Sequence, residues 1–359
     1  MFAALVFLAA IVALGVWIYR DRTHPSWHDL FSAGQDAYNR SEYAVALTKL
    51  EPALAGAERD RSTDPKTLAA VIDWLALTER HLANHDKAEA LFRRELPLNE
   101  SAYGKNSLDY VSNLLDIEQT LAELGKDAER TPLLEEANAI LAKLPTSNDS
   151  DRKRALALHE LASLRYNQGR DKEAEELWKQ AVAIRFRLDG EKSTAAATTL
   201  VNLATFASNY HYRSEEAVSL YERALGIFEA KNPDSDDVGF ILLHIANIKR
   251  KSGAKSDEII ALYRRALTIY EHTYGSDNKQ LIEPLTGLCR TLENSKQYQE
   301  AITLRLRLLA LIEKYGAEDE EEDVADQHGF LAKDYAALGD KANAQRHKDI
   351  AQKLWAEGD

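Results

Sequence analysis

The sequence has very little of what builds disulfide frameworks and metal centres. Among its 359 residues there is one cysteine, Cys289. A single cysteine excludes a disulfide within the chain and a cysteine-rich zinc site. Cys289 occupies a position, in the repeat described below, where a small side chain is required. We therefore expect it to pack in the core rather than to react.

The common signatures of catalysis and nucleotide binding are also missing. The sequence contains no G-x-S-x-G, no Walker-type glycine loop and no G-x-G-x-x-G. His81 and His85 are four residues apart and would share a helix face, but no third metal ligand follows at a motif spacing. We therefore predict no enzymatic activity, no cofactor and no metal site.

Positive charge is in the minority. The chain has 45 Lys and Arg against 58 Asp and Glu, which gives a net charge of −13. An acidic surface repels phosphates, and no basic stripe with interleaved aromatic residues is present. Nucleic acid is therefore not an expected partner, and a protein or peptide is.

One uncharged run stands at the start of the sequence, over residues 2–19. At 1.5 Å per residue a helix of this length would be about 27 Å long, enough to span a bilayer core. A cleaved signal peptide would need a positive n-region, which is absent, so we expect an uncleaved transmembrane anchor over 2–19 and a juxtamembrane linker over 20–25. Arg20 and Arg22 favour a cytoplasmic side for the rest of the chain, with a periplasmic or extracellular side as the alternative.

A motif recurs about every 42 residues in the rest of the chain. The clearest copies have a small or aliphatic residue, Leu three positions on and a second small or aliphatic residue seven positions on. Seven residues are two helical turns, so both residues lie on one stripe and allow a second helix to approach closely. The clearest pairs are Ala174 and Ala181, Ala217 and Ala224, Ile259 and Ala266, and Ala301 and Leu308, with further copies near Ala44, Ala88 and Ala344. A divergent copy, residues 107–144, has Arg130 where the others have Ala.

A second helix is indicated upstream of each copy. It carries apolar residues at helical spacing and a Leu-small or Ile-small step, and Gly or polar residues separate it from the next helix. The steps are Leu161-Ala162, Leu203-Ala204, Ile245-Ala246, Leu288-Cys289 and Leu331-Ala332. This pattern predicts about eight helix-turn-helix units over residues 26–359, with about one extra residue before the second helix near 205–215 and 247–258.

This pattern resembles the tetratricopeptide repeat, and its long period resembles the repeats of kinesin light chain. The resemblance rests on the Leu-Ala step, on Glu-Ala at the start of the second helix, on Ala-Leu-x-Ile at 224–227 and 266–269, and on Tyr-Gly at 103–104, 274–275 and 315–316. It implies an all-α fold, a right-handed α-solenoid in which the first helix of each pair lines the concave side.

The resemblance also implies a partner-binding groove on the first helices. Asn113 and Asn202 resemble the Asn residues that kinesin-light-chain-like repeats place there, where an amide can bond a peptide backbone. Arg would contact main chain and carboxylates, and Tyr and Leu would form apolar pockets. The implied groove residues are Asp73, Leu77, Arg80, Asn113, His159, Ser163, Tyr166, Asn202, Thr205, Asn247, Arg250, Arg290 and Glu293.

We therefore predict a membrane-tethered adaptor that binds a protein or peptide partner in the concave groove of its repeats. One alternative is a structural or assembly subunit of a membrane-associated complex, which would pack by its convex or edge surface. An enzyme of unknown type is a further alternative. The acidic segment 318–323 is interpreted as a solvated connection, with a docking site for a basic segment as the alternative.

Overall fold

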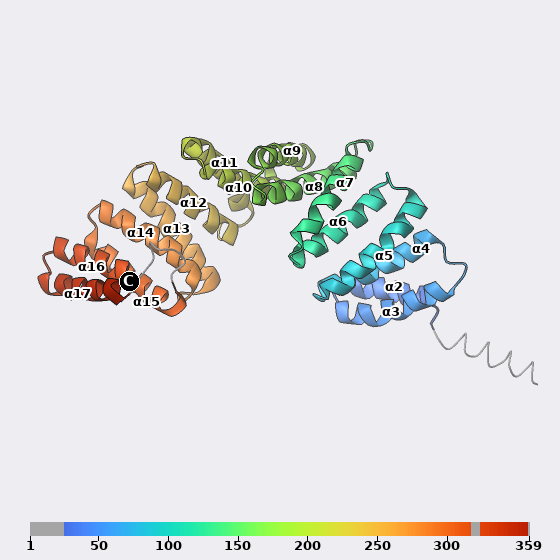
Figure 1. The fold of residues 1–359 in the computed structure, drawn as a ribbon, viewed down its shortest axis with the longest axis horizontal. Coiled ribbons are helices and arrows are strands. Elements are labelled where there is room, and N and C mark those ends of the chain that lie inside the picture. The colour runs from blue at the N-terminus through green and yellow to red at the C-terminus, as the bar shows by residue number, and fades with distance from the viewer. Residues whose placement is uncertain (1–24, 317–323, 358–359) are drawn as a thin grey trace, which may run out of the picture. The chain divides into compact units, whose positions relative to one another are not determined.

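The computed structural model describes residues 25–316 and 324–357, and every regular element in these ranges is helical (Figure 1). Sixteen α-helices follow one another as eight successive pairs. This confirms an α-solenoid of about eight helix pairs. The right-handed coil and the domain limits 2–19, 20–25 and 26–359 stay predictions.

The helices of the eight pairs have the following bounds. The first helices are α2 (Trp27–Asn39), α4 (Pro65–His81), α6 (Leu108–Glu123), α8 (Asn148–Asn167), α10 (Thr194–Ser208), α12 (Asp236–Lys251), α14 (Ile282–Asn294) and α16 (Val324–Ala337). The second helices are α3 (Tyr43–Arg59), α5 (His85–Tyr103), α7 (Asp127–Leu141), α9 (Asp171–Asp189), α11 (Ser214–Lys231), α13 (Ser256–Tyr274), α15 (Tyr298–Tyr315) and α17 (Lys341–Glu357).

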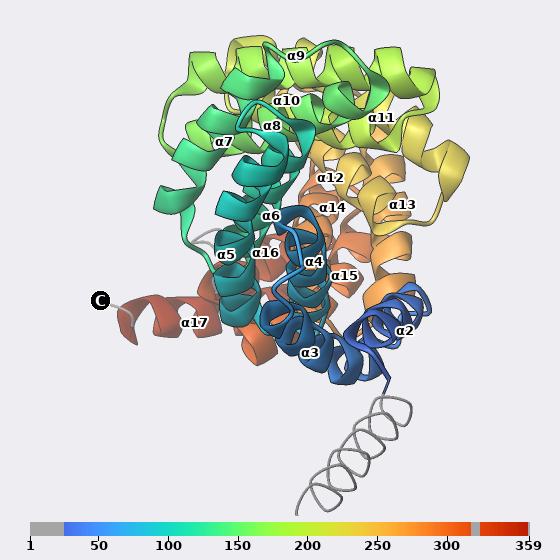
Figure 2. The ribbon, with the colours of Figure 1, turned by 90° about the vertical axis from the view of Figure 1, so that its right-hand side faces the viewer.

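The chain divides into two compact units, residues 1–184 and 185–359. Inside the first unit each helix from α2 to α8 packs against the next one along the chain, and Figure 2 shows α3 to α6 side by side. Inside the second unit the same holds from α10 to α17. A helix pair has two apolar faces, and the neighbouring pairs bury them.

The second helices share one register, which confirms the seven-residue rule. In α3, α5, α9, α11, α13 and α15 the fourth residue of the helix and the residue seven positions later face the core, and Ala174, Ala181, Ala217 and Ala224 are fully buried. The residue four positions after the first one is large, because it fills the space between the two small residues. These large residues are Leu50, Phe92, Leu134, Trp178, Tyr221, Tyr263 and Arg305.

The first copy of the motif is shifted from the prediction. Ala44 is exposed, whereas Ala46 and Ala53 are buried. The stretch Tyr43 to Ala46 contains two alanines, Ala44 and Ala46. Ala46, the fourth residue of α3, is the one that packs in the core.

The extra residues that we predicted near 205–215 and 247–258 lie in the turns inside two of the pairs. In α4–α5 the turn is residues 82–84 and in α6–α7 it is residues 124–126. The turn α10–α11 is residues 209–213 and contains the 3-10 helix η2 (His211–Arg213), and the turn α12–α13 is residues 252–255. The prediction of longer turns at these two places is confirmed.

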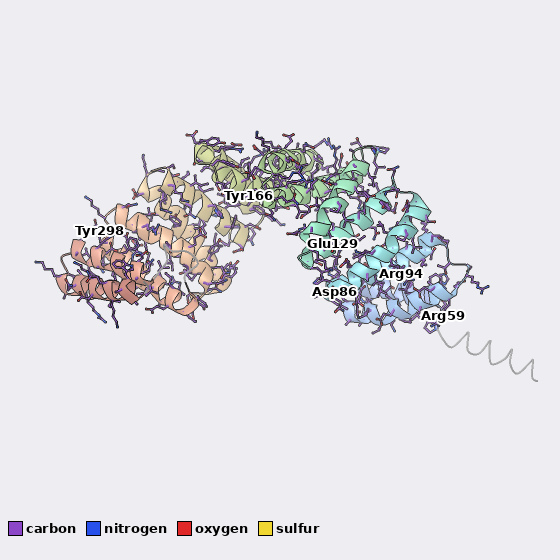
Figure 3. All side chains as sticks on the ribbon, in the orientation of Figure 1. Arg59, Asp86, Arg94, Glu129, Tyr166 and Tyr298 are labelled. Carbon is purple, nitrogen blue, oxygen red and sulfur yellow. The ribbon has the colours of Figure 1, made fainter. Side chains whose placement is uncertain are left out.

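Ion pairs link the second helices of neighbouring pairs. Arg93 Nη2 of α5 lies 2.6 Å from Glu129 Oε2 of α7, and Arg94 of α5 pairs with Glu58 of α3. Figure 3 labels Arg94 and Glu129 on these helices. Exposed pairs of this kind contribute little stability each, typically about 0–1 kcal/mol.

The predicted localisation needs a correction. Within residues 25–316 and 324–357 no helix combines the length and the apolar character needed to cross a bilayer. The predicted anchor, residues 2–19, lies outside the described residues, as do residues 20–24 of the predicted linker and the acidic segment 318–323. The structure therefore gives no support for a single-pass membrane anchor, and that prediction is withdrawn.

A glycine on α14 permits a close approach between a first and a second helix. A Cβ atom at Gly287 would overlap the ring of Tyr263, which is fully buried on α13. The ring cannot move aside easily, because its hydroxyl donates to Asn247 Oδ1 at 2.5 Å. We expect Gly287→Ala to lower the free energy of unfolding by about 1–3 kcal/mol in urea titrations.

Gly226 on α11 provides the matched control for this substitution. A Cβ atom there would have no neighbour within 4 Å. Gly226→Ala should therefore leave stability unchanged or raise it by up to about 1 kcal/mol, since alanine is the better helix former. Equal losses for both variants would contradict the close-approach explanation.

Candidate functional site

Polar side chains line a cavity of about 460 Å³ in the first unit, between α4, α5 and α6. Three of the predicted groove residues, Asp73, Leu77 and Asn113, come together in it. The complete lining is Lys66, Ala69, Ala70, Asp73, Leu77, Glu95, Asn99, Tyr103, Asp109, Ser112, Asn113 and Asp116. We call this space the acidic cavity.

A buried carboxyl group, Glu95 of α5, forms the inner wall of the acidic cavity. Its side chain accepts hydrogen bonds from Asn99 Nδ2 at 2.7 Å and from Asn113 Nδ2 at 2.9 Å. Glu95 is 5% exposed, and this burial raises its pKa to about 9, with a smaller contribution from the charge of Asp73. The neutral amides compensate the cost of burying the carboxylate only in part.

Two aspartates complete the acidic wall. Burial raises the pKa of Asp73 to about 7, and the neighbouring charge of Asp116 adds to the effect. Burial also raises the pKa of Asp116, although Arg80 Nη1 lies 3.1 Å from Asp116 Oδ1 and opposes the shift. The predicted groove residue Arg80 thus acts as an ion-pair partner inside the site.

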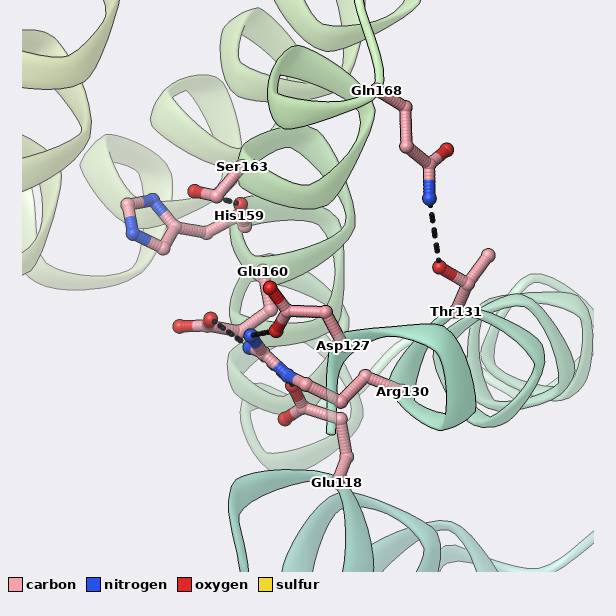
Figure 4. A network of polar contacts seen from close by, with 8 residues as sticks. All are labelled: Glu118, Asp127, Arg130, Thr131, His159, Glu160, Ser163 and Gln168. Carbon is pink, nitrogen blue, oxygen red and sulfur yellow. Dashed lines mark hydrogen bonds and ion pairs between the residues drawn. The ribbon is translucent and has the colours of Figure 1, made fainter. Parts of the chain in front are cut away.

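A second cavity, of about 360 Å³, lies between α6, α7 and α8 and shares Ser112 and Asp116 with the first. The divergent Arg130 lies in its wall. Figure 4 shows Arg130 reaching from α7 toward Glu118 of α6 and Glu160 of α8. Its Nε donates to Glu118 Oε1 at 2.8 Å, and its Nη2 lies 3.1 Å from Glu160 Oε2. The residue that replaces Ala in this copy therefore joins three helices through carboxylates.

The predicted residues of α8 do not line these two cavities. Ser163 Oγ donates to the carbonyl oxygen of His159 at 3.2 Å, as Figure 4 shows, and the half-buried Tyr166 ring lies 5.8 Å from Trp178. Lys153, Leu156 and Glu160 of α8 are the residues that line the second cavity instead.

The predicted residues of the second unit mainly join neighbouring helices. Thr205 Oγ1 lies 2.8 Å from the Tyr221 hydroxyl, and Asn202 is half-buried on the same helix. Asn247 Nδ2 donates to Glu283 Oε1 at 2.8 Å.

Three further contacts in the second unit act in the same way. Arg250 Nε donates to the Tyr263 hydroxyl at 3.2 Å. Glu293 forms an ion pair with Arg305, and the Arg290 guanidinium lies 5.8 Å from the centre of the Phe330 ring. Many polar groups of these side chains therefore bond with other residues of the chain.

Sequence reasoning missed the contribution of α5 to the site. Glu95, Asn99 and Tyr103 lie on a second helix, whereas only first helices were expected to line the groove. One signal was available, because Glu95 stands seven residues after Ala88. At this position the neighbouring copies have Ala53 and Ala137, which are fully buried. A carboxyl group at a buried small-residue position marks the site.

The two histidines with metal-ligand spacing have different partners. The His81 ring stacks on Tyr43 with a centroid distance of 4.3 Å, and His85 Nδ1 lies 2.8 Å from Glu123 Oε2. The part of the chain that the structure describes holds no group of three or more His, Cys, Asp or Glu residues that could bind a metal ion. Cys289 is fully buried, and burial raises the pKa of its thiol to about 12, which confirms its packing role.

Comparison with known families identifies the repeat. Residues 153–230 match the tetratricopeptide repeat profile, so this part of the chain carries tetratricopeptide repeats. No curated protein matches the sequence.

Several solved structures have a similar fold. The apo form of RapI has a TM-score of 0.61 and 10% identity, over 92% of this chain and 86% of that one. The apo quorum sensor NprR from B. thuringiensis has a TM-score of 0.57 and 15% identity, over 86% and 84%. A putative kinesin light chain from Podosopora anserina has a TM-score of 0.47 and 21% identity, over 58% and 97%. At these identities the likeness shows the fold alone, and the subfamily stays a prediction.

Proposed function

We propose that this chain is a protein-interaction scaffold that binds an extended peptide segment of a partner in the groove of its first unit. One observation carries the proposal: the two cavities share Ser112 and Asp116, and the first helices of three successive pairs line them. Tetratricopeptide solenoids typically act in recognition rather than in catalysis, because stacked helices offer an extended concave surface.

The dimensions and chemistry of the two cavities support this role. Their volumes of about 460 and 360 Å³ fall in the range of pockets that hold ligand groups, about 300–1,000 Å³. Leu77 supplies apolar contact in the acidic cavity, and Leu156 does so in the second cavity. Ser112, which lines both cavities, and Gln119 of the second cavity supply hydrogen-bonding groups. A segment crossing Ser112 would place neighbouring side chains in each cavity.

A second candidate, an assembly subunit that packs by another surface, is favoured by the last helix pair. A mostly apolar cavity of about 700 Å³ lies on α16 and α17, and Trp355 beside it is 47% exposed. Large exposed aromatic side chains are enriched where proteins associate.

A comparison of two surface variants distinguishes these candidates. Purified chain immobilised on beads captures partners from the source lysate, and quantitative mass spectrometry compares the variants. We expect the groove variant Gln119→Arg/Leu156→Glu to lose the captured partner at least tenfold, because Gln119 and Leu156 are exposed and border the second cavity.

The control is Trp355→Ala on the last pair. This variant should keep the partner if the groove binds it. Loss with Trp355→Ala and retention with the groove variant would overturn the groove proposal in favour of the assembly role. Far-UV circular dichroism checks that both variants keep their helices.

A further inference from the structure

The acidic cavity has more carboxyl groups than cationic groups on its walls. Four of its lining residues carry carboxyl groups, Asp73, Glu95, Asp109 and Asp116, and one carries an ammonium group, Lys66. Arg80 pairs with Asp116 from the side. The hydrogen-bond partners of Glu95 are the neutral amides of Asn99 and Asn113.

An unused acceptor lies in the same wall. Asn113 is 2% exposed, and its Oδ1 has no hydrogen-bond partner within the described part of the chain. Its Nδ2 is already used by Glu95. A buried amide oxygen without a donor is costly, and only a donor can satisfy it. This atom therefore indicates that the missing group donates hydrogen bonds.

The rim of the cavity already holds one ammonium group against an aromatic ring. Lys66 Nζ lies 5.5 Å from the centre of the Tyr103 ring, and both residues line the cavity. The face of an aromatic ring attracts cations. The acidic cavity thus combines carboxylates, an unused acceptor and an aromatic face, all of which favour a cation that donates hydrogen bonds.

We propose that the acidic cavity receives the cationic side chain of a Lys or Arg residue in the bound peptide segment. This proposal rests on the proposed function, since the groove must bind an extended segment. Ammonium and guanidinium groups have three and five N–H donors, enough to bond the carboxylates of Asp73 and Glu95 together with Asn113 Oδ1. The neighbouring residues of the segment then lie over Ser112 toward the second cavity.

Binding of a cation should depend on pH. The charged and titratable groups that face the cavity are Lys66, Asp73 and Arg80 of α4, Glu95 and Tyr103 of α5, and Asp109 and Asp116 of α6. Burial raises the pKa of Asp73 to about 7 and that of Glu95 to about 9, so both hold protons near neutral pH more than ordinary carboxyl groups do. A cation displaces these protons, and its affinity should rise between pH 6 and pH 8.5.

The test uses peptide pools rather than an identified ligand. Each pool is a fluorescein-labelled nonapeptide mixture with one fixed central residue, which is Lys, Arg, Gln, Glu or Leu, and random neutral residues elsewhere. Fluorescence anisotropy with the full chain gives the affinities. We expect the Lys and Arg pools to bind at least tenfold more tightly than the Gln and Glu pools.

Isosteric variants link this preference to the cavity. Asp73→Asn and Glu95→Gln should each reduce the preference for Lys over Gln at least fivefold. Asp86→Asn is the matched control, because it removes the same charge from an exposed residue of α5 outside the cavity lining. A preference that Asp86→Asn reduces as much as the cavity variants would overturn the assignment.

Other outcomes separate this proposal from the proposed function. Equal binding of all pools, abolished by Gln119→Arg/Leu156→Glu, would overturn the cationic preference and leave the groove intact. Binding of no pool would overturn both. N-acetyl-lysine methylamide that binds as tightly as the Lys pool would show a site for small cations and would overturn the assignment to a peptide.

Discussion

Arg305→Ala should lower the free energy of unfolding by about 3–5 kcal/mol, because it leaves buried acids without their cation. The Arg305 side chain is fully buried on α15. Nη1 bonds Gln327 Oε1 at 2.5 Å, Nε lies 3.8 Å from Asp334 Oδ2, and the guanidinium stacks 4.6 Å from the centre of the Phe330 ring. The neighbouring copies have Tyr221 and Tyr263 at the same position, so one charged side chain here replaces a core aromatic ring.

Asp334 explains why the loss is large. Its side chain is 3% exposed, and burial with the charge of Glu293 raises its pKa to about 7 even with Arg305 beside it. Without the arginine this group must either take up a proton or remain buried and charged. The double variant Arg305→Ala/Asp334→Ala should therefore lose less stability than the sum of its single variants.

The matched control is Arg307→Ala, two residues along the same helix. Arg307 pairs with Glu271 and its side chain is 30% exposed, so the expected loss is at most about 1 kcal/mol. Urea unfolding followed by circular dichroism measures four variants: Arg305→Ala, Asp334→Ala, the double variant and Arg307→Ala. A loss below about 1 kcal/mol for Arg305→Ala would contradict the structural role that we assign to it.

Glu95→Gln should raise stability at pH 8 by about 2 kcal/mol or more, and change it little at pH 4. In the folded chain burial raises the pKa of Glu95 to about 9, well above the ordinary 4.5 of a glutamate side chain. The folded state therefore binds more protons than the unfolded state between these values. The contribution of Glu95 to stability is full below pH 4.5 and declines as pH rises toward 9, and glutamine removes this contribution.

Denaturant titrations at several pH values measure the effect. Glu100→Gln on the same helix is the control, because Glu100 is exposed and the change should have no pH-dependent effect on stability. An equal gain at pH 4 and pH 8 for Glu95→Gln would show that burial of the charge is not the cause. The gain in stability should accompany the loss of cation preference, since buried charges at binding sites often reduce stability.

The periodic part of the fold could be predicted from the sequence, because helix geometry alone determines it. A seven-residue spacing gives two turns of one helix, so the pairs, the register and the longer turns followed directly. The first copy was placed two residues early because each alanine satisfies one half of the spacing: Ala44 has Leu47 three positions on, and Ala46 has Ala53 seven positions on. The packing of α3 selects Ala46.

The candidate site was harder to predict, because its side chains depend on neighbours that are distant in sequence. Asp73, Leu77 and Asn113 share one face of successive first helices and line one cavity, and their role in binding a partner stays a prediction. Asn247 and Glu293 instead bond with residues outside their own helices, Glu283 and Arg305. The sequence pattern of a single helix does not indicate partners that lie on other helices. It also does not indicate that Glu95, on a second helix, lines the site.

The ion pairs of Arg130 have a consequence for how the chain folds. Units of similar sequence can dock with the wrong neighbour, and repeat proteins misassemble in this way. Arg130 of α7 requires Glu118 from its own pair and Glu160 from the next pair, and its side chain is only 11% exposed. A mispaired unit would leave this buried guanidinium without Glu160. The least typical repeat thus favours its own neighbour, the pair that begins with α8, over the other units.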